Sequence, residues 1–339
     1  MMSPSATRNC LPPVSMIAYI TTERYHVAPF AVNANGGSPT PPGAGEAAGR
    51  TVSSSPMSAA AEREAGSFEA ALAACTAEPL AESHELSAAF RRDGWVPLGR
   101  LLEAVWEERL RREAHDLVAS AALRRDVTVG VTGNSPRRME IVGQSMIAAH
   151  GGLLPRLYAA ESILALVAAV AGRPVRRCPY EPERFILSVL AKPGDTHGWH
   201  WDDYPYALVF IVDGPAPGGG GLLEFVPRTV WNKDDPRVAA FVRRGPVGRA
   251  HLRSGDAYLL RSDTTLHRVS ELGPGSGRRI AFAMAFADVD DDRIVTHETT
   301  ECLYGSSVPA GATRATEASI QARYSREPRS STIAISGSS

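Results

Sequence analysis

The pattern of apolar and polar positions divides the chain into a helical first half and a second half of short strands. Residues 101–123 carry an apolar stripe at helical spacing with charged residues opposite, which predicts an amphipathic helix. The stripe consists of Leu101, Leu102, Val105, Leu110, Leu117 and Val118. A more apolar helix is predicted over residues 153–172, ending at Gly172. The segments FEAALAACTAEP and ESHELSAAFRRDG predict two shorter helices before them.

Short apolar segments, separated by clusters of Gly, Pro and Asp, dominate the second half and predict β-strands. The predicted strands cover residues 183–192, 206–213, 221–227, 250–262 and 278–288. Because helices are followed by a run of strands, the pattern favours an α+β fold.

The two ends of the chain differ in composition from the middle. Residues 1–66 include a stretch dominated by Gly, Pro, Ser and Ala, and we expect a disordered N-terminal extension there. Residues 305–339 are rich in Ser, Thr, Ala and Gly and are expected to form a flexible tail. The sequence therefore predicts one folded domain over residues 67–304.

The charge balance argues against nucleic acid as a partner. The 339 residues include 36 basic and 37 acidic ones, a net charge of −1, so the chain lacks the basic excess that binds phosphates. No apolar run reaches the roughly 18 residues that span a bilayer, so no membrane partner is expected. The four cysteines are far apart and form no CxxC pair. This disfavours a disulfide framework and a structural zinc site, and it fits a reducing cytoplasm.

The strongest chemical signal is the segment HGWHWDDY, which places His200 and Asp202 two positions apart. His267 follows in SDTTLHRVSEL, between two predicted strands. Two imidazoles and one carboxylate form a facial triad that leaves one side of a metal ion open, which suits Fe(II). Zinc more often takes three protein ligands and a water in a tetrahedron. His200 and Asp202 alone would fit a surface loop better, but with His267 they are predicted to hold iron.

Arg279 is the predicted anchor for a further carboxylate. In the strand RRIAFAMAFAD, Arg279 shares one face with Ala281, Ala283 and Ala285, whereas Arg278 and the bulky apolar residues share the other. An arginine whose neighbours on the face are all alanine has open space in front of it. A bidentate partner of a dicarboxylate needs such space. The alternative for Arg279 is a surface salt bridge.

The segments HGWHWDDY, GGGGLLEFVP, HRV at His267 and RIAF at Arg279 together resemble a known family. It is the iron(II)- and 2-oxoglutarate-dependent family that hydroxylates or chlorinates free amino acids, notably lysine-type substrates. The resemblance covers residues 80–304 and implies a double-stranded β-helix (jelly-roll, cupin-like) core with an N-terminal helical layer. It also implies Fe(II), 2-oxoglutarate and O2, with ascorbate in support. In the halogenating members a small residue replaces the carboxylate ligand, so Asp202 resembles the hydroxylating members.

The resemblance further implies substrate contacts. The segment NSPRRM is similar to the family's segment in which an arginine holds the substrate α-carboxylate, and Arg137 is the better match. Glu183 and Asp203 match the acidic positions that receive substrate amino groups. An arginine with two carboxylates is the charge pattern that a cationic amino acid requires. Arg137 stands beside Arg138, and Glu183 stands beside Arg184. Arg137 and Glu183 could therefore be solvated charges instead.

The sequence thus predicts a cytoplasmic dioxygenase that hydroxylates an unactivated C–H bond of a small molecule, by resemblance a free basic amino acid. Three alternatives stay open at this point. One is a halogenase or desaturase on the same scaffold, and another is a hydroxylase of a carrier-tethered or protein substrate. The third is a non-catalytic jelly roll that binds a metabolite, which would have no reason to keep the triad together with Arg279.

Overall fold

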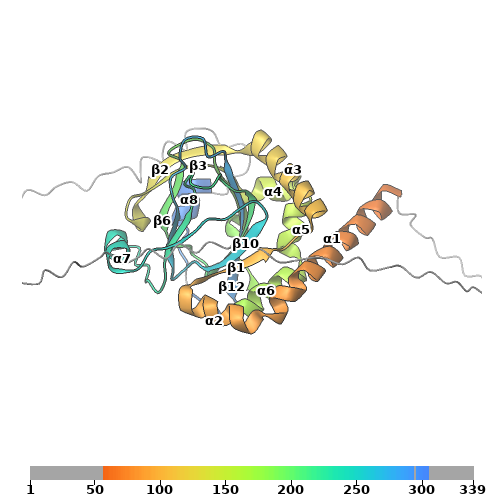
Figure 1. Ribbon diagram of the computed structural model, residues 1–339, viewed down its shortest axis with the longest axis horizontal. Coiled ribbons are helices and arrows are strands. Elements are labelled where there is room, and N and C mark those ends of the chain that lie inside the picture. Colours follow the sequence, from red (N-terminus) through yellow and green to blue (C-terminus); the bar gives the residue numbers. More distant parts are fainter. Residues whose placement is uncertain (1–55, 294, 305–339) are drawn as a thin grey trace, which may run out of the picture.

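The computed structural model describes residues 56–293 and 295–304, which form a curled antiparallel sheet flanked by helices (Figure 1). The helices are α1 (Pro56–Ala81), α2 (Ser83–Asp93), α3 (Ala104–Ala121), α4 (Gln144–His150), α5 (Leu153–Ala159), α6 (Glu161–Ala171), α7 (Val238–Arg244) and α8 (Glu298–Tyr304), with 3-10 turns η1 (Gly130–Thr132) and η2 (Glu181–Glu183). The strands are β1 (Trp95–Arg100), β2 (Leu123–Val129), β3 (Ser135–Val142), β4 (Val175–Arg177), β5 (Phe185–Leu190), β6 (Thr196–His200), β7 (Tyr206–Asp213), β8 (Leu223–Val226), β9 (Gly248–Ala250), β10 (Asp256–Arg261), β11 (Leu266–Val269) and β12 (Arg279–Asp288).

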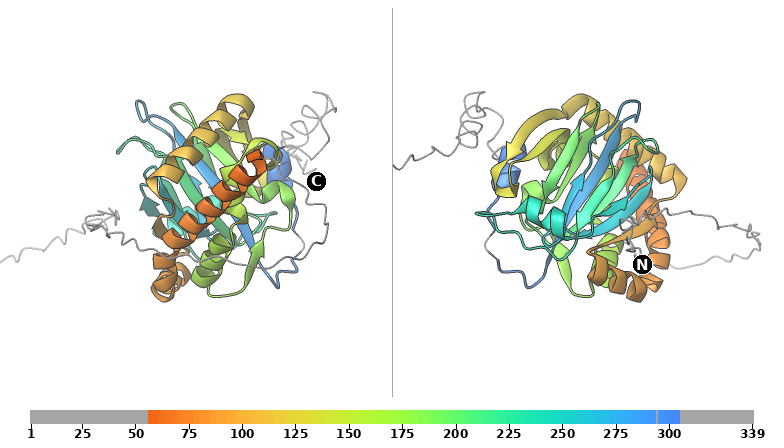
Figure 2. Two further views of the ribbon diagram at one scale, coloured as in Figure 1. Left: turned by 90° about the vertical axis from the view of Figure 1, so that its right-hand side faces the viewer. Right: turned by 60° about the vertical axis from the view of Figure 1, so that its left-hand side comes forward.

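The strand order explains how the sheet encloses an interior. It runs β1-β10-β7-β12-β5-β3-β6-β11-β8-β9, with β2 paired to β3 and β4 paired to β12. The sheet curls over, so that side chains of β8 pack against those of β7 and β10 in a shared interior cluster (Figure 2). This is the predicted double-stranded β-helix core, and with the flanking helices it confirms the predicted α+β class.

Side chains alternate along the central strands between the two faces of the sheet. On β12, Ile280, Phe282, Met284 and Phe286 belong to the large cluster beneath the helices, whereas Ala281 belongs to the interior cluster. A strand directs successive side chains to opposite faces. The predicted division of this strand into a bulky face and an alanine face is therefore confirmed.

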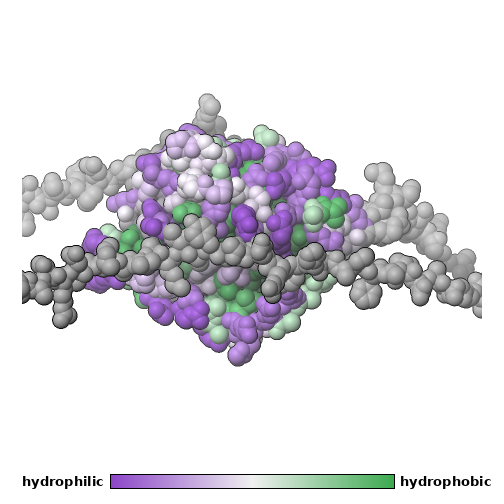
Figure 3. Space-filling view, in the orientation of Figure 1, coloured by the Kyte–Doolittle hydropathy of each residue, from purple (hydrophilic) through white to green (hydrophobic). Residues whose placement is uncertain are grey.

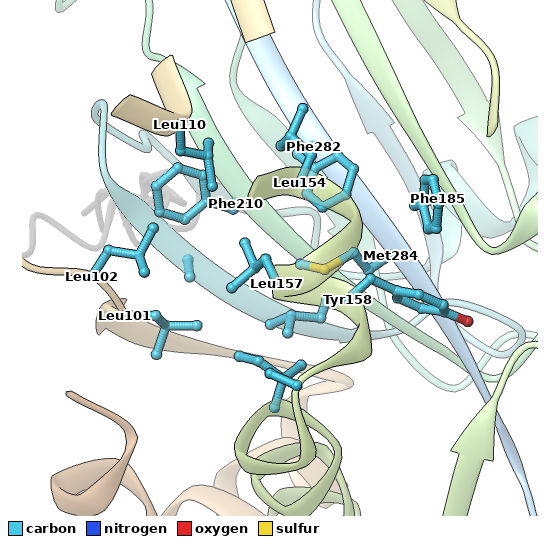
Figure 4. Close-up of a cluster of buried hydrophobic side chains, with 14 of the residues drawn as sticks. Leu101, Leu102, Leu110, Leu154, Leu157, Tyr158, Phe185, Phe210, Phe282 and Met284 are labelled. Carbon is cyan, nitrogen blue, oxygen red and sulfur yellow. The ribbon is translucent and has the colours of Figure 1, made fainter. Parts of the chain in front are cut away.

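The largest hydrophobic cluster lies between the helices and the outer face of the sheet (Figure 4). Leu110 of α3 and Leu154 and Leu157 of α5 pack there with Phe210 of β7 and Phe282 of β12. Each of these side chains is almost completely buried. Burial of one such side chain stabilises a fold by roughly 1.5–3 kcal/mol. The helical layer therefore braces the strands whose other faces enclose the interior.

The predicted helix over residues 101–123 is confirmed as α3, which is shorter at both ends. The predicted start of the folded domain at residue 67 falls inside α1, which begins at Pro56. The remainder of the predicted N-terminal extension and the predicted tail over residues 305–339 lie outside the described residues.

The single helix predicted over residues 153–172 is wrong, because the chain is extended at Ala160 (ψ 132°) between α5 and α6. Arg177 accounts for the break. Its guanidinium donates hydrogen bonds to the carbonyl oxygen of Tyr158 (3.1 Å) and to that of the next residue, the last of α5. The predicted end at Gly172 is confirmed, with a left-handed φ of 71°.

The strand predicted over residues 206–213 is β7, and shorter strands lie within three of the other predicted ranges, as β5, β8 and β12. The strand predicted over residues 250–262 is wrong as a single element. A turn with Gly255 at φ 87° separates the end of β9 from β10. Strands β1, β2, β3, β4, β6 and β11 were not predicted. Strand β2 is mostly polar, and β4 has only three residues.

The face of the molecule shown in Figure 3 is mostly hydrophilic, with small separate hydrophobic patches. Among the described residues, no single helix has the length and apolar character to cross a membrane, and α5 and α6 meet that standard only as a pair bent by 48°.

Glu113 of α3 holds the first turn of α5, and its removal is predicted to destabilise the fold. Its carboxylate accepts hydrogen bonds from the backbone N–H groups of Gly152 (2.8 Å), Leu153 (2.6 Å) and Leu154 (3.0 Å). These N–H groups have no partner within the helix, and the helix dipole favours a negative charge beside them. Glu113→Ala should lower the free energy of unfolding, measured by urea denaturation, by about 1–3 kcal/mol.

Glu108→Ala provides the control on the same helix. The side chain of Glu108 is 60% exposed and lies 3.7 Å from Arg112, so its removal should change the free energy of unfolding by less than about 0.5 kcal/mol. Equal losses in the two variants would contradict the capping role of Glu113.

Candidate active site

The two imidazoles of the predicted triad face each other across one pair of strands. His200 is the last residue of β6, and His267 lies on β11. The antiparallel register pairs these two residues directly, and their ring centroids are 4.1 Å apart. Directly opposed residues project from the same face of a sheet. Strand register therefore brings together two histidines that are distant in the sequence.

Asp202 brings a carboxylate to the same point. It follows β6, and its backbone N–H donates a hydrogen bond to the carbonyl oxygen of Ser262 (3.1 Å). The carboxylate oxygens lie 3.6 Å from Nε2 of His200 and 3.9 Å from Nε2 of His267. One ligand atom from each of the three residues lies within 4.8 Å of the others. The structure thus brings the whole predicted triad together.

Backbone carbonyl groups fix the tautomer of both histidines. Nδ1 of His200 lies 2.7 Å from the carbonyl oxygen of Gly198. Nδ1 of His267 lies 2.9 Å from that of Thr265. A carbonyl oxygen only accepts, so Nδ1 carries the proton and Nε2 keeps its lone pair toward Asp202. Burial lowers the pKa of both imidazoles, so they stay in the neutral form that binds a metal.

A cavity beside the triad is lined by the alanine face of β12. Arg279, Ala281, Ala283 and Ala285 all line it, whereas Arg278 is exposed and precedes the strand. The side chain of Arg279 is buried, and its Nη2 has no hydrogen-bond partner within the described residues. A buried donor without a partner is costly. A carboxylate would satisfy it with matching geometry.

Tyr258 of β10 is a second polar group beside Arg279. It lines the same cavity and hydrogen-bonds to the Arg279 side chain. Burial raises the pKa of Tyr258, while Arg279 opposes this shift. The phenol therefore stays protonated and can donate to a carboxylate held by Arg279. The sequence carried no signal for this residue, which lies within an apolar strand.

Glu183 and Asp203 also line the cavity, where they form a pair of carboxylates. One oxygen of each lies within 4.8 Å of the other and of a nitrogen of His297. Glu183 accepts a hydrogen bond from Oγ1 of Thr300 (2.7 Å) and lies 2.7 Å from Nδ1 of His297. Burial, with the charge of Asp203, raises the pKa of Glu183 to about 7. The structure therefore brings the two predicted acidic residues together in one cavity.

Arg137 lies on β3, and the structure does not place it among the residues that line the cavity. Its side chain is fully buried and donates hydrogen bonds to Oγ of Ser135 (2.8 Å) and Oγ1 of Thr132 (3.3 Å). In the strand register it is paired with His197. After the larger effect of burial, the charge of Arg137 also lowers the pKa of His197 and of His200. Arg137 thus projects from the same face of the sheet as His197, which lines the cavity, and is close enough for its charge to act on the triad.

The residues that surround the acidic pair come from segments to which the sequence analysis gave no role. Lys233 precedes α7 and binds Asp203, and its Nζ lies 2.7 Å from Oδ1 of the carboxylate. His297, which directly precedes α8, and Thr300 of α8 bind Glu183. None of these positions belongs to a recognisable local motif, so only the folded chain reveals them.

A profile of the halogenase D family matches residues 79–305, which is more than half of the chain. The chain belongs to the halogenase D family. Among the curated proteins, none matches it. The family supports the oxygenase interpretation of the sequence, while a free amino acid as substrate stays a prediction.

Several solved structures are similar in fold to this halogenase D family member. The epimerase SnoN, in complex with Fe3+, alpha ketoglutarate and nogalamycin RO, is 21% identical with a TM-score of 0.51, over 69% of this chain and 92% of that chain. AviO1 from Streptomyces viridochromogenes Tue57 is 22% identical with a TM-score of 0.49, over 61% and 95%. A prolyl hydroxylase from Trichoplax adhaerens is 11% identical with a TM-score of 0.47, over 62% and 91%. At such low identity, the likeness to the SnoN complex shows the fold alone.

The donor set of this halogenase D family member fits iron and its co-substrate. Two neutral imidazoles and one carboxylate are the facial ligands of non-heme Fe(II) oxygenases. The partnerless Nη2 of Arg279 fits a carboxylate of 2-oxoglutarate. Family membership and ligand set together make the protein an iron(II)- and 2-oxoglutarate-dependent oxygenase.

Arg279→Gln is predicted to weaken the binding of 2-oxoglutarate, because glutamine removes the positive charge and the paired N–H donors. Loss of a charge-assisted hydrogen bond to a buried carboxylate should raise the Kd by about tenfold to a hundredfold. Isothermal titration of the Fe(II)-loaded protein without O2 measures this Kd. The exposed neighbour Arg278 supplies the control, and Arg278→Gln should leave the Kd unchanged. Equal effects in the two variants would rule out the anchor role of Arg279.

Proposed function

We propose that this protein hydroxylates an unactivated C–H bond of a small molecule, a free basic amino acid, with Fe(II) and 2-oxoglutarate. The observation that carries the proposal is the position of Asp202. Its carboxylate lies 3.6 Å from the Nε2 atom of His200 and 3.9 Å from that of His267. His200, Asp202 and His267 would therefore hold the iron, which would bring 2-oxoglutarate and O2 together beside the substrate.

The family profile is that of a halogenase, so halogenation is the second candidate. A halogenase has to hold a halide beside the metal, and in the halogenating enzymes that this chain resembles a small residue leaves the place for it. Here the carboxylate of Asp202 points at the same place as the two imidazoles. Asp202 therefore favours hydroxylation over halogenation.

The bound iron, 2-oxoglutarate and O2 would supply the oxidising power, while 2-oxoglutarate is converted to succinate and CO2. The residues of the chain position the reactants. Arg279 and Tyr258 would orient 2-oxoglutarate through its far carboxylate, and the alanines of β12 leave room for it. Placement of one C–H bond near the metal selects the carbon that reacts, so orientation rather than acid–base chemistry sets the outcome.

The charges around the cavity support a basic amino acid as the substrate. Glu183 and Asp203 offer carboxylates to an amino group, and such charge-assisted hydrogen bonds are the stronger kind. Arg137 would contribute the positive charge that attracts the α-carboxylate. Its charge reaches the triad, and it is paired in the strand register with His197, which lines the cavity. Glu183, Asp203 and Arg137 are therefore the proposed substrate-binding residues.

Succinate formation tests the proposed reaction. Purified protein receives Fe(II), ascorbate and 2-oxoglutarate under air, with each common amino acid and ornithine in turn, and products are identified by mass spectrometry. We expect one basic amino acid to raise succinate formation and to gain the mass of one oxygen atom. Asp202→Ala should abolish both, because the iron loses one of its three protein ligands.

Other outcomes separate the alternatives. A product that gains chlorine in a chloride-containing buffer would establish the halogenase. Slow succinate formation that no amino acid stimulates would contradict the free-amino-acid substrate and leave the cofactors in place. The absence of both iron binding and succinate would contradict the oxygenase itself.

The raised pKa of Glu183 predicts that the use of a basic substrate depends on pH. Below pH of about 7 the carboxyl is mostly protonated, and above it the ionised form is available to an ammonium group. The kcat/KM for the basic substrate should therefore decrease as the pH falls below this pKa, by at most about tenfold per pH unit. Glu183→Gln should remove this dependence and lower kcat/KM above the pKa. An identical pH profile in that variant would assign the titration to another group.

A further inference from the structure

Of the 36 basic residues in the chain, only Lys192 and Lys233 are lysines, and Lys233 lies beside the active-site cavity. Its Nζ is 2.7 Å from Oδ1 of Asp203, 3.0 Å from Oε2 of Glu298 and 2.9 Å from Oγ1 of Thr296. It also contacts the carbonyl oxygen of Thr296. A lysine ammonium is a compact charge with three donors. These contacts occupy all the donors of the Lys233 ammonium, whereas the side chain of Lys192 is exposed.

The ammonium of Lys233 binds one of the two carboxylates that are proposed to receive a substrate amino group. The side chain of Asp203 is only 4% exposed, and Glu183 is its close neighbour in the cavity. Two carboxylates so close repel each other strongly in a poorly solvated site. Lys233 offsets the charge of Asp203. Glu183 contacts His297 and Thr300, which carry no fixed positive charge, so Glu183 is the carboxylate left for the substrate.

Further contacts keep Lys233 in this position. Its Nζ lies 4.5 Å from the centre of the Trp231 ring, and Nε1 of Trp231 donates a hydrogen bond to the carbonyl oxygen of Val131 (2.7 Å). The ion pair with Glu298 connects Lys233 to α8, whose residue Thr300 lines the cavity. The ammonium is thus held beside the cavity, through Asp203 that lines it, rather than being a mobile surface charge.

We propose that Lys233 is a specificity-determining residue, because its ammonium occupies Asp203 and limits the acidic pair to one cationic group of the substrate, received at Glu183. The inference rests on the proposed function, since it refines how the same cavity recognises a basic substrate. Removal of the Lys233 charge would release a second carboxylate, and the cavity would then favour a cationic ligand more strongly.

A double-mutant cycle tests this role with lysine and norleucine, which differ only in the side-chain amino group. Isothermal titration of protein loaded with Fe(II) and 2-oxoglutarate, without O2, gives the Kd of each ligand. The ratio of the two Kd values isolates the contribution of the side-chain ammonium of the ligand. Lys233→Met should raise the preference for lysine about tenfold, because Asp203 becomes a buried carboxylate without its cation. Adding Asp203→Asn to this variant should return the ratio to the wild-type value.

Two further variants complete the design. Lys192→Met alters the exposed lysine and should leave the ratio unchanged. Lys233→Gln replaces Lys233→Met if the methionine variant does not fold, with the same expected rise. If Lys233 had a purely structural role, its replacement would weaken the binding of both ligands alike. An unchanged ratio of the two Kd values in the Lys233 variants would therefore overturn the inference.

The wild-type ratio separates this inference from the proposed function. If the wild type prefers lysine and the Lys233 variants keep the same ratio, the inference fails and the basic substrate stands. If the wild type binds both ligands equally and the Lys233 variants gain a preference for lysine, the inference stands and the basic substrate fails. Binding of neither ligand to any variant would overturn both.

Discussion

The site depends on the register between β6 and β11. This pairing places His267 directly opposite His200, and β8 holds β11 from its other side. A slip of one residue would turn His267 to the opposite face of the sheet, because side chains alternate along a strand. The backbone carbonyls of Gly198 and Thr265 then orient each imidazole. The candidate metal site therefore arises from the sheet itself, with Asp202 added by the turn that follows β6.

The same alternation separates stability from function on β12. Its bulky residues, such as Phe282, pack against the helical layer, and its alanines line the cavity with Arg279. Small side chains in the cavity cost little stability here, because the hydrophobic cluster on the other face supplies the packing. Phe282 therefore braces the strand whose opposite face carries Arg279. The helices thus contribute to function indirectly, by holding the rear of the cavity.

The sequence predicted the parts of the site that are encoded in local patterns. The spacing of His200 and Asp202 and the alanine face around Arg279 are visible in short segments, and the structure places them as expected. Tyr258 and Lys233 could not be predicted, because they reach the site through long-range strand pairing and through a loop. The helix break before α6 escaped prediction for the same reason, since the arginine that stabilises it comes from β4.

Consecutive residues connect the candidate metal ligands to the proposed substrate-binding carboxylates. Asp202 points toward the two imidazoles, whereas Asp203 points toward Lys233 and Glu183. Both carboxylates extend from one short turn, so a displacement of either side chain acts on the same backbone. A cation that binds beside Asp203 therefore interacts with the segment that positions Asp202, a proposed metal ligand. Charge at the proposed substrate end of the cavity and geometry at the candidate metal site are thus properties of a single turn. Lys233 already holds one of its two carboxylates in place.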